Sequence, residues 1–113
     1  MHELGITESI INIALDKARE AEVSRIAEIS LVIGELSGFV PDCIEFYFNS
    51  LSKGTIAEEA TLNFKVAPAQ FCCRDCSTAF QPQDTLYTCP KCQSHSLEIA
   101  GGRELYVESI EVE

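Results

Sequence analysis

The chain has 113 residues and a formal net charge of −10, from 18 acidic and 8 basic side chains. A chain of this length buries roughly two-thirds of its unfolded surface and can fold alone around one modest core. The acidic balance argues against nucleic acid as a partner, since phosphates are neutralised by a basic surface, and favours a basic protein or a cation. No apolar run approaches the ~20 residues that span a bilayer. The lack of a signal-peptide pattern, with cysteines in metal-type pairs, predicts a cytoplasmic protein.

Two helices and three strands are expected outside the cysteine-rich part of the chain. Apolar residues recur at helical spacing over residues 7–22, with Thr7 as the expected N-cap. A β-rich run follows at 26–33. Pro41 is expected at the first position of the second helix, whose apolar positions are Ile44, Tyr47, Phe48 and Leu51. Alternation over 61–67 and 104–113 predicts two more strands, and the phase shift between Val107 and Ile110 predicts a bulge.

Some side chains of these elements carry their own expectations. Leu62, Phe64 and Val66 alternate with polar residues and are expected to point inward. Cys43 is expected to be a small apolar packing residue. The aromatic run 46–48 is interpreted as core.

Two cysteine pairs, Cys73-x-x-Cys76 and Cys89-x-x-Cys92, are separated by twelve residues. This spacing is typical of a zinc site made of four thiolates, in preference to disulfides or a redox dithiol. Four protein ligands leave no open position for water, so the zinc is expected to be structural, with no catalytic role. Cys72 is expected to be unligated because it breaks the spacing, and His95 is interpreted as a solvated loop residue.

The element order predicts a small α/β (α+β) domain, with two helices on a three-stranded mixed sheet, interrupted by a zinc-ribbon module. We assign residues 1–67 and 103–113 to the α/β domain and residues 68–102 to the zinc module. Pro68 and the pair Gly101-Gly102 are expected to act as hinges. This arrangement is compatible with a monomer or with a homodimer formed by exchange of a terminal segment.

A second metal candidate lies at Met1-His2. The α-amine, the His2 backbone nitrogen and the imidazole form fused chelate rings, and the Glu3 amide or carboxylate, or a group from elsewhere, could complete a plane. Planar nitrogen donors suit Ni²⁺ or Cu²⁺ better than zinc or magnesium. Because chain termini are usually disordered, this pattern alone is a weak indication of metal binding.

The whole chain resembles the HypA/HybF family. The matching segments are Met1-His2-Glu3, Ile33-Gly34-Glu35-Leu36-Ser37, the four paired cysteines, and Ser109-Ile110-Glu111-Val112-Glu113. The resemblance implies a nickel site on Met1, His2 and Glu3 and a separate structural zinc on Cys73, Cys76, Cys89 and Cys92. It also implies nickel exchange with the GTP-hydrolysing insertion protein HypB, and delivery to the hydrogenase large subunit or, in some members, to urease. Ser77 and Gln93 depart from the glycine that zinc ribbons commonly carry after the second cysteine.

The sequence is therefore interpreted as a non-enzymatic nickel carrier with a structural zinc module. The main alternative is an acidic zinc-ribbon adaptor that docks a protein and binds no nickel. A nucleic-acid-binding ribbon is opposed by the net charge, and a zinc hydrolase by the closed coordination sphere.

Overall fold

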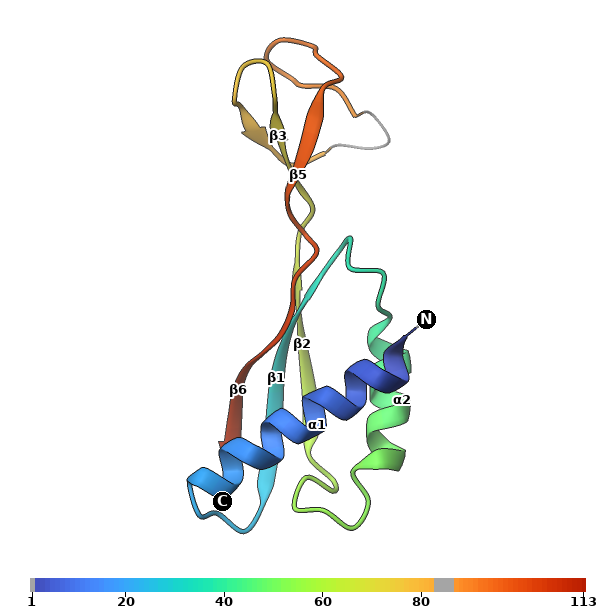
Figure 1. Ribbon diagram of the computed structural model, residues 1–113, viewed down its shortest axis with the longest axis vertical. Coiled ribbons are helices and arrows are strands. Elements are labelled where there is room, and N and C mark those ends of the chain that lie inside the picture. Colours follow the sequence, from blue (N-terminus) through green and yellow to red (C-terminus); the bar gives the residue numbers. More distant parts are fainter. Residues whose placement is uncertain (1, 83–86) are drawn as a thin grey trace.

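The computed structural model describes residues 2–82 and 87–113, in an elongated shape of 55 × 26 × 17 Å. Figure 1 shows a lower lobe with both helices and an upper lobe, joined by a narrow neck. The elements in chain order are α1 (Glu3–Glu20), β1 (Ile26–Gly34), α2 (Pro41–Leu51), β2 (Thr61–Ala67), β3 (Gln70–Cys73), β4 (Ala79–Phe80), β5 (Leu97–Gly101) and β6 (Leu105–Val112).

The lower lobe contains a mixed three-stranded sheet in the order β2-β1-β6. The central strand β1 pairs with β2 in parallel and with β6 in antiparallel fashion. The register along β6 passes from Ser109 directly to Val107, which confirms the predicted bulge and leaves Glu108 as the extra residue. Two helices on a mixed sheet with a separate cysteine module confirm the expected fold class.

Helix α1 begins four residues earlier than expected, at Glu3. Thr7 is therefore not the N-cap but a fully buried residue within the helix, where its hydroxyl donates to the Glu3 carbonyl oxygen at 2.5 Å. His2 occupies the N-cap position, and the Ile6 amide donates to its carbonyl oxygen. At the other end, Glu22 has a φ of 55°, the left-handed conformation that commonly closes a helix.

The helices cover one face of the lower sheet, and the core between them is made of aliphatic side chains and one phenylalanine. Its fully buried large members include Ile26, Ile29, Leu31, Ile44 and Phe48. Helix α1 crosses the sheet obliquely and leaves the end nearest the neck uncovered (Figure 1).

Three expectations about side chains are wrong. Val66 was expected to point into the core but is 58% exposed: it lies on the edge strand β2, whereas its partner Ile33 on the central strand β1 is 2% exposed. Cys43 is exposed, so it is not a packing residue. Of the aromatic run, Phe48 is in the core but Phe46 is 70% exposed, since its position on α2 faces away from the sheet.

Hydrogen bonds between segments far apart in the sequence hold the neck together. The Glu35 backbone amide donates to the Ala67 carbonyl oxygen at 2.8 Å, and the Glu35 carboxylate accepts from the Ala69 amide at 2.9 Å. The Leu36 amide donates to the Gly102 carbonyl oxygen at 2.6 Å. Both linkers to the upper lobe are thus tied to the loop that follows β1, and hinge motion at Pro68 and Gly101-Gly102 stays a prediction.

The upper lobe is a second three-stranded sheet, in the order β4-β3-β5, with both pairings antiparallel. The ring of Phe71 contacts those of Phe80 and Tyr87 edge-on, with centroids 6.0 and 5.6 Å apart. This cluster is small, so the lobe depends on further cross-links. Among the described residues, no helix is long and apolar enough to cross a membrane.

Candidate metal centre

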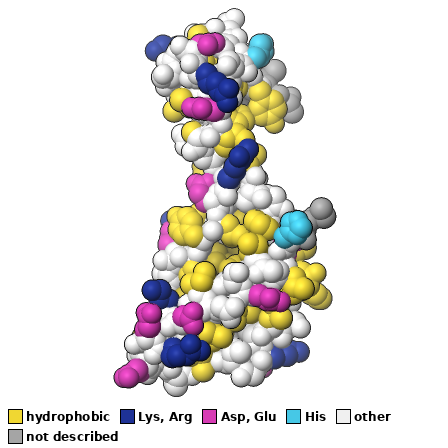
Figure 2. Space-filling view, viewed as in Figure 1, with side chains coloured by type: hydrophobic (Ala, Val, Ile, Leu, Met, Phe, Trp, Pro, Cys, Tyr) yellow, Lys and Arg dark blue, Asp and Glu magenta, His cyan; other side chains and the backbone are white. Residues whose placement is uncertain are grey.

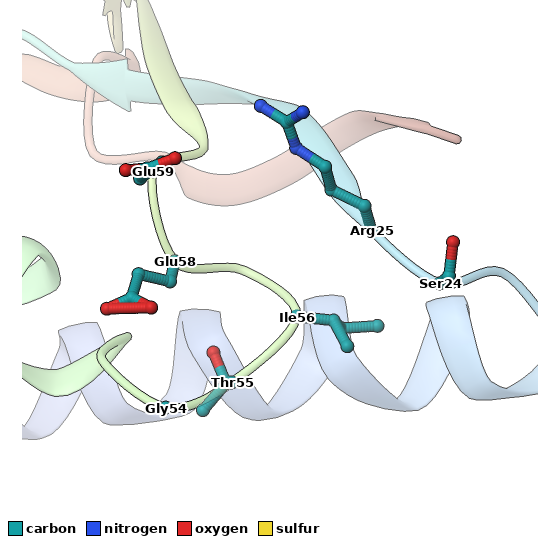
Figure 3. Close-up of a pocket in the computed structure, with 7 residues that line it drawn as sticks. All are labelled: Ser24, Arg25, Gly54, Thr55, Ile56, Glu58 and Glu59. Carbon is teal, nitrogen blue, oxygen red and sulfur yellow. The ribbon is translucent and has the colours of Figure 1, made fainter.

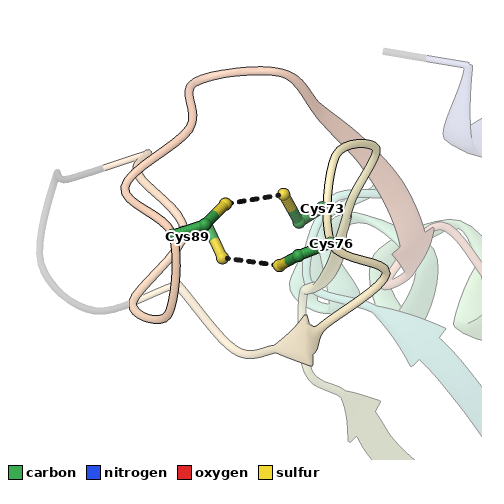
Figure 4. Close-up of side chains that lie close together, drawn as sticks. Cys73, Cys76 and Cys89 are labelled. Atoms are coloured by element: carbon green, nitrogen blue, oxygen red, sulfur yellow. Dashed lines mark hydrogen bonds between the residues drawn. The ribbon is translucent and has the colours of Figure 1, made fainter.

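The four paired cysteines converge in the upper lobe. Their sulfur atoms all lie within 4.8 Å of one another. The Sγ atoms of Cys73 and Cys92 are 3.5 Å apart, and those of Cys76 and Cys89 are 3.6 Å apart (Figure 4). We call each Cys-x-x-Cys segment, with the turn that follows it, a knuckle. Each of the two close sulfur pairs joins a cysteine of the first knuckle to a cysteine of the second. Four thiols around one point form the donor set of a closed tetrahedral zinc site.

Each knuckle is shaped by the same two backbone hydrogen bonds. In the first, the Cys73 amide donates to the Thr78 carbonyl oxygen and the Ser77 amide donates to the Cys73 carbonyl oxygen. The second knuckle repeats both bonds sixteen positions later, with the Cys89 and Gln93 amides as donors. Ser77 and Gln93 have φ values of 62° and 63°, so both knuckles adopt the left-handed turn without the usual glycine.

The thiols of the cluster differ strongly in acidity. A hydrogen bond with the Thr78 hydroxyl, 3.0 Å away, is the main reason that the pKa of Cys76 falls to about 6. For Cys92, the Ser94 backbone amide lowers the pKa, but Cys73, burial and the other two sulfurs outweigh it and raise the pKa to about 12. Four negative charges cannot share this small space without a cation, so the donor set fits a divalent metal ion.

The two other ligand candidates of the upper lobe lie outside the cluster. Cys72 is half-buried, and its thiol is 3.8 Å from the Cys73 carbonyl oxygen. His95 lies within the second knuckle, where its Nδ1 atom is 3.2 Å from the Thr88 hydroxyl and 3.4 Å from the Tyr87 carbonyl oxygen. Neither residue belongs to the group of converging metal ligands among the residues that the structure describes.

The amino-terminal end of α1 lies beside the start of α2 (Figure 1). The Glu3 side chain is only 4% exposed, and its Oε2 atom accepts a hydrogen bond from the Val40 amide at 3.2 Å. His2 is exposed next to it. Met1, the remaining member of the predicted nickel site, lies outside the described residues. Sequence reasoning missed the partner of Glu3 because Val40 is 37 residues away.

An open pocket of about 530 Å³ lies between the end of α1 and the loop that follows α2 (Figure 3). Its charged lining residues are Arg25, Glu58 and Glu59. The Arg25 guanidinium pairs with the Glu113 carboxylate at 3.5 Å, and both side chains are more than half exposed. Within residues 2–82 and 87–113, the four cysteines are the one group of potential metal ligands that converges, so this pocket offers no comparable site.

An α/β lobe joined by a neck to a lobe built on four converging thiols defines a small metal-binding protein. The family model described as "Hydrogenase/urease nickel incorporation, metallochaperone, hypA" matches residues 1–112. The hydrogenase maturation factor HypA of Dehalococcoides mccartyi is 44% identical over 113 residues, covering 100% of this chain and 95% of the relative. That of Caldanaerobacter subterraneus is 38% identical over 114 residues, with 100% of both chains covered.

Solved structures agree with this assignment. The solution structure of a HypA protein has a TM-score of 0.77 at 25% identity, covering 99% of this chain and 96% of that one. The solution structure of the Ni metallochaperone HypA from Helicobacter pylori has a TM-score of 0.69 at 24% identity and shows the same fold, with 99% and 97% covered. The chain belongs to the HypA family of nickel metallochaperones for hydrogenase maturation.

Proposed function

We propose that this chain binds Ni²⁺ at its amino terminus and delivers it for [NiFe]-hydrogenase maturation, while a zinc ion on the four cysteines holds the upper lobe in shape. The observation that carries the proposal is the pairing of an exposed His2 with a buried Glu3 at the very start of a helix. The Met1 amine and the His2 imidazole bind the ion, and backbone nitrogens near Glu3 complete the plane.

The positive potential at the start of helix α1 favours metal donors that carry negative charge. The first amides of α1 lack intrahelical partners, and the helix dipole places positive charge at this end. A cation held there by neutral donors is opposed by that charge. Deprotonated amide nitrogens bring negative charge to the metal, so they are the donors best suited to this end of the helix.

The two sites differ in accessibility in the way that their roles require. Cys73 and Cys89 are 1% and 0% exposed and Cys76 is half-buried, so three of the four thiols are shielded and only Cys92 is exposed, which suits an ion that stays bound. His2 is exposed, which suits an ion that is handed over. We place the chain in the cytoplasm, exchanging nickel with the insertion protein HypB before delivery to the hydrogenase large subunit; urease is a second candidate recipient. The chain acts as a carrier and catalyses no reaction.

The test is metal analysis of tag-free protein that retains Met1, with and without added nickel. The native chain is expected to hold one zinc and to bind one further nickel ion. The His2→Ala variant should lose nickel binding and keep its zinc and its fold. The Cys76→Ser variant should lose zinc and loosen the upper lobe, since metal binding and folding of such a lobe are coupled.

Two results would contradict the proposal. If the native protein with a free Met1 carries zinc but binds no nickel, the alternative function, an acidic zinc-ribbon adaptor that docks a protein, is the one that remains. A His2→Ala variant that binds nickel normally, or that loses zinc, would show that the two sites do not divide the work as proposed. A chain whose Met1 α-amine is blocked by acetylation is a matched control, because it removes the amine donor and leaves every side chain and its position in place.

A further inference from the structure

Helix α2 exposes an apolar stripe made of Val40, Cys43 and Phe46. Val40 is 47% and Phe46 is 70% exposed, and Cys43 is also exposed. Cys43 and Phe46 are three positions apart in α2 and are therefore neighbours on its surface, and Val40 is the N-cap residue just before the helix. Phe46 has the largest exposed fraction among the exposed large hydrophobic side chains of the described residues. Its ring contacts only the edge of Tyr47 among aromatic neighbours in the described chain, with centroids 5.4 Å apart.

Packing of the lower lobe does not explain the stripe. Ile44 and Phe48 of the same helix are fully buried and supply its contribution to the core. Aromatic side chains are enriched where proteins bind one another, and a single buried aromatic often supplies much of the binding energy. An exposed phenylalanine that continues a line of exposed apolar side chains therefore indicates a partner.

The charge around the stripe indicates what kind of partner it is. Helix α2 contains Asp42 and Glu45 and no basic residue. Residues 1–67 and 103–113 hold 15 of the 18 acidic but 6 of the 8 basic side chains of the chain. Several of those basic groups are already paired with carboxylates, as in Lys65–Glu108 at 3.8 Å. The surface around the stripe thus attracts a basic protein and repels a second copy of this acidic chain.

The stripe also starts at the proposed nickel site. The Val40 amide is the group that donates to the Glu3 carboxylate, so the first residue of the stripe touches the residue that follows His2. Figure 1 shows the start of α2 beside the amino-terminal end of α1. In the same orientation, Figure 2 shows hydrophobic side chains at the surface along the edge where α2 lies. A protein seated on the stripe would reach the amino terminus of this chain.

We propose that Val40, Cys43 and Phe46 form the docking surface for the protein that exchanges nickel with this chain, and that this partner presents an apolar pocket rimmed by Lys and Arg. The inference rests on the proposed function and specifies where the exchange partner binds. Phe46 fills the pocket. Asp42 and Glu45 face the basic rim, which accelerates encounter and orients the partner so that its own ligands meet the amino terminus.

The test measures binding of the full-length, zinc-loaded chain to purified HypB from the same genome, by calorimetry and by surface plasmon resonance. Phe46→Ala should weaken the complex by at least about 10-fold, as expected for an aromatic anchor. The double variant Asp42→Asn, Glu45→Gln should slow association and reduce its dependence on salt. Tyr106→Ala is the matched control, because Tyr106 is 51% exposed on the opposite face of the sheet and should have no effect.

Metal analysis of each variant separates this proposal from the proposed function. Phe46 is not a metal ligand, so Phe46→Ala should retain zinc and the nickel binding of the native chain. A native chain that binds HypB through Phe46 but holds no nickel would overturn the proposed function and leave the docking surface standing. The docking surface is overturned if Phe46→Ala binds HypB as tightly as the native chain or if the native chain does not bind HypB. It is also overturned if light scattering shows a native dimer that Phe46→Ala dissociates.

Discussion

The left-handed residues of the two knuckles make a quantitative prediction. Ser77 and Gln93 have φ values of 62° and 63° and are exposed. A residue with a side chain destabilises the folded state by roughly 1–2 kcal/mol in this conformation. Glycine avoids that strain but lowers the free energy of unfolding by about 0.5–1 kcal/mol, because it has more conformational freedom in the unfolded chain. Ser77→Gly and Gln93→Gly should therefore each stabilise the zinc-loaded lobe by about 0.5–1 kcal/mol.

Zinc affinity reports this change because metal binding and folding of the lobe are coupled. Since 1.4 kcal/mol is a factor of ten, each variant should bind zinc about 2- to 5-fold more tightly in competition with a chromogenic chelator. Ser96→Gly is the matched control, because Ser96 is an exposed serine of the same lobe whose φ is not positive. Glycine there should weaken binding by a similar factor. Equal affinities for Ser77→Gly and Ser96→Gly would refute the reasoning.

Three further predictions concern the cluster, the neck and the amino terminus. Removing the Thr78 hydroxyl in Thr78→Val should return the pKa of Cys76 from about 6 towards the usual thiol value. Zinc binding at pH 7 should then weaken, because the Cys76 thiolate loses the hydrogen bond that favours it over the thiol; competition with a chromogenic chelator measures the affinity. Gly34→Ala should destabilise the protein by about 3 kcal/mol in urea unfolding, since its Cβ would overlap the Gly102 carbonyl group. Glu3→Ala should weaken nickel binding while Glu3→Gln preserves most of it, if the side chain acts by accepting the hydrogen bond at the start of α2; equal losses in a nickel titration would show that the carboxylate itself binds the metal.

Local sequence signals predicted those parts of the fold that local physics determines. Pro41 begins α2 because proline lacks the amide that the first helical position does not need. The phase change in β6 predicted its bulge, and the spacing of the cysteines predicted their convergence. Each of these signals depends on a few neighbouring residues.

The errors arise where a contact distant in sequence overrides the local pattern. Thr7 has the side chain of a typical N-cap, so the start of α1 was expected there; the helix begins at Glu3, whose carboxylate accepts from the distant Val40 amide. Pro68 and the pair Gly101-Gly102 were predicted as hinges from residue type alone, and that prediction did not include the bonds from Glu35 to Ala67 and Ala69 in the neck. Alternation put Val66 in the core because it gives the face of a residue but does not show that its strand lies at the edge of the sheet.

The same distinction explains why the two candidate sites were predicted with different certainty. The four thiols come from two segments, and their repeated spacing already specifies a converging geometry. The donors of the amino-terminal site are consecutive in the chain, so their sequence specifies a chelate but says nothing about where it lies. Its position is set by Glu3, which is buried against α2 and thereby places the exposed His2 beside the stripe that begins at Val40. A chelate on a disordered terminus would bind nickel less tightly, because its donors would have to be ordered on binding, and it would present the metal to no particular surface. For the nickel site that we propose, the contact between Glu3 and Val40 therefore serves both affinity and delivery, because it fixes the start of α1 and directs it towards the stripe.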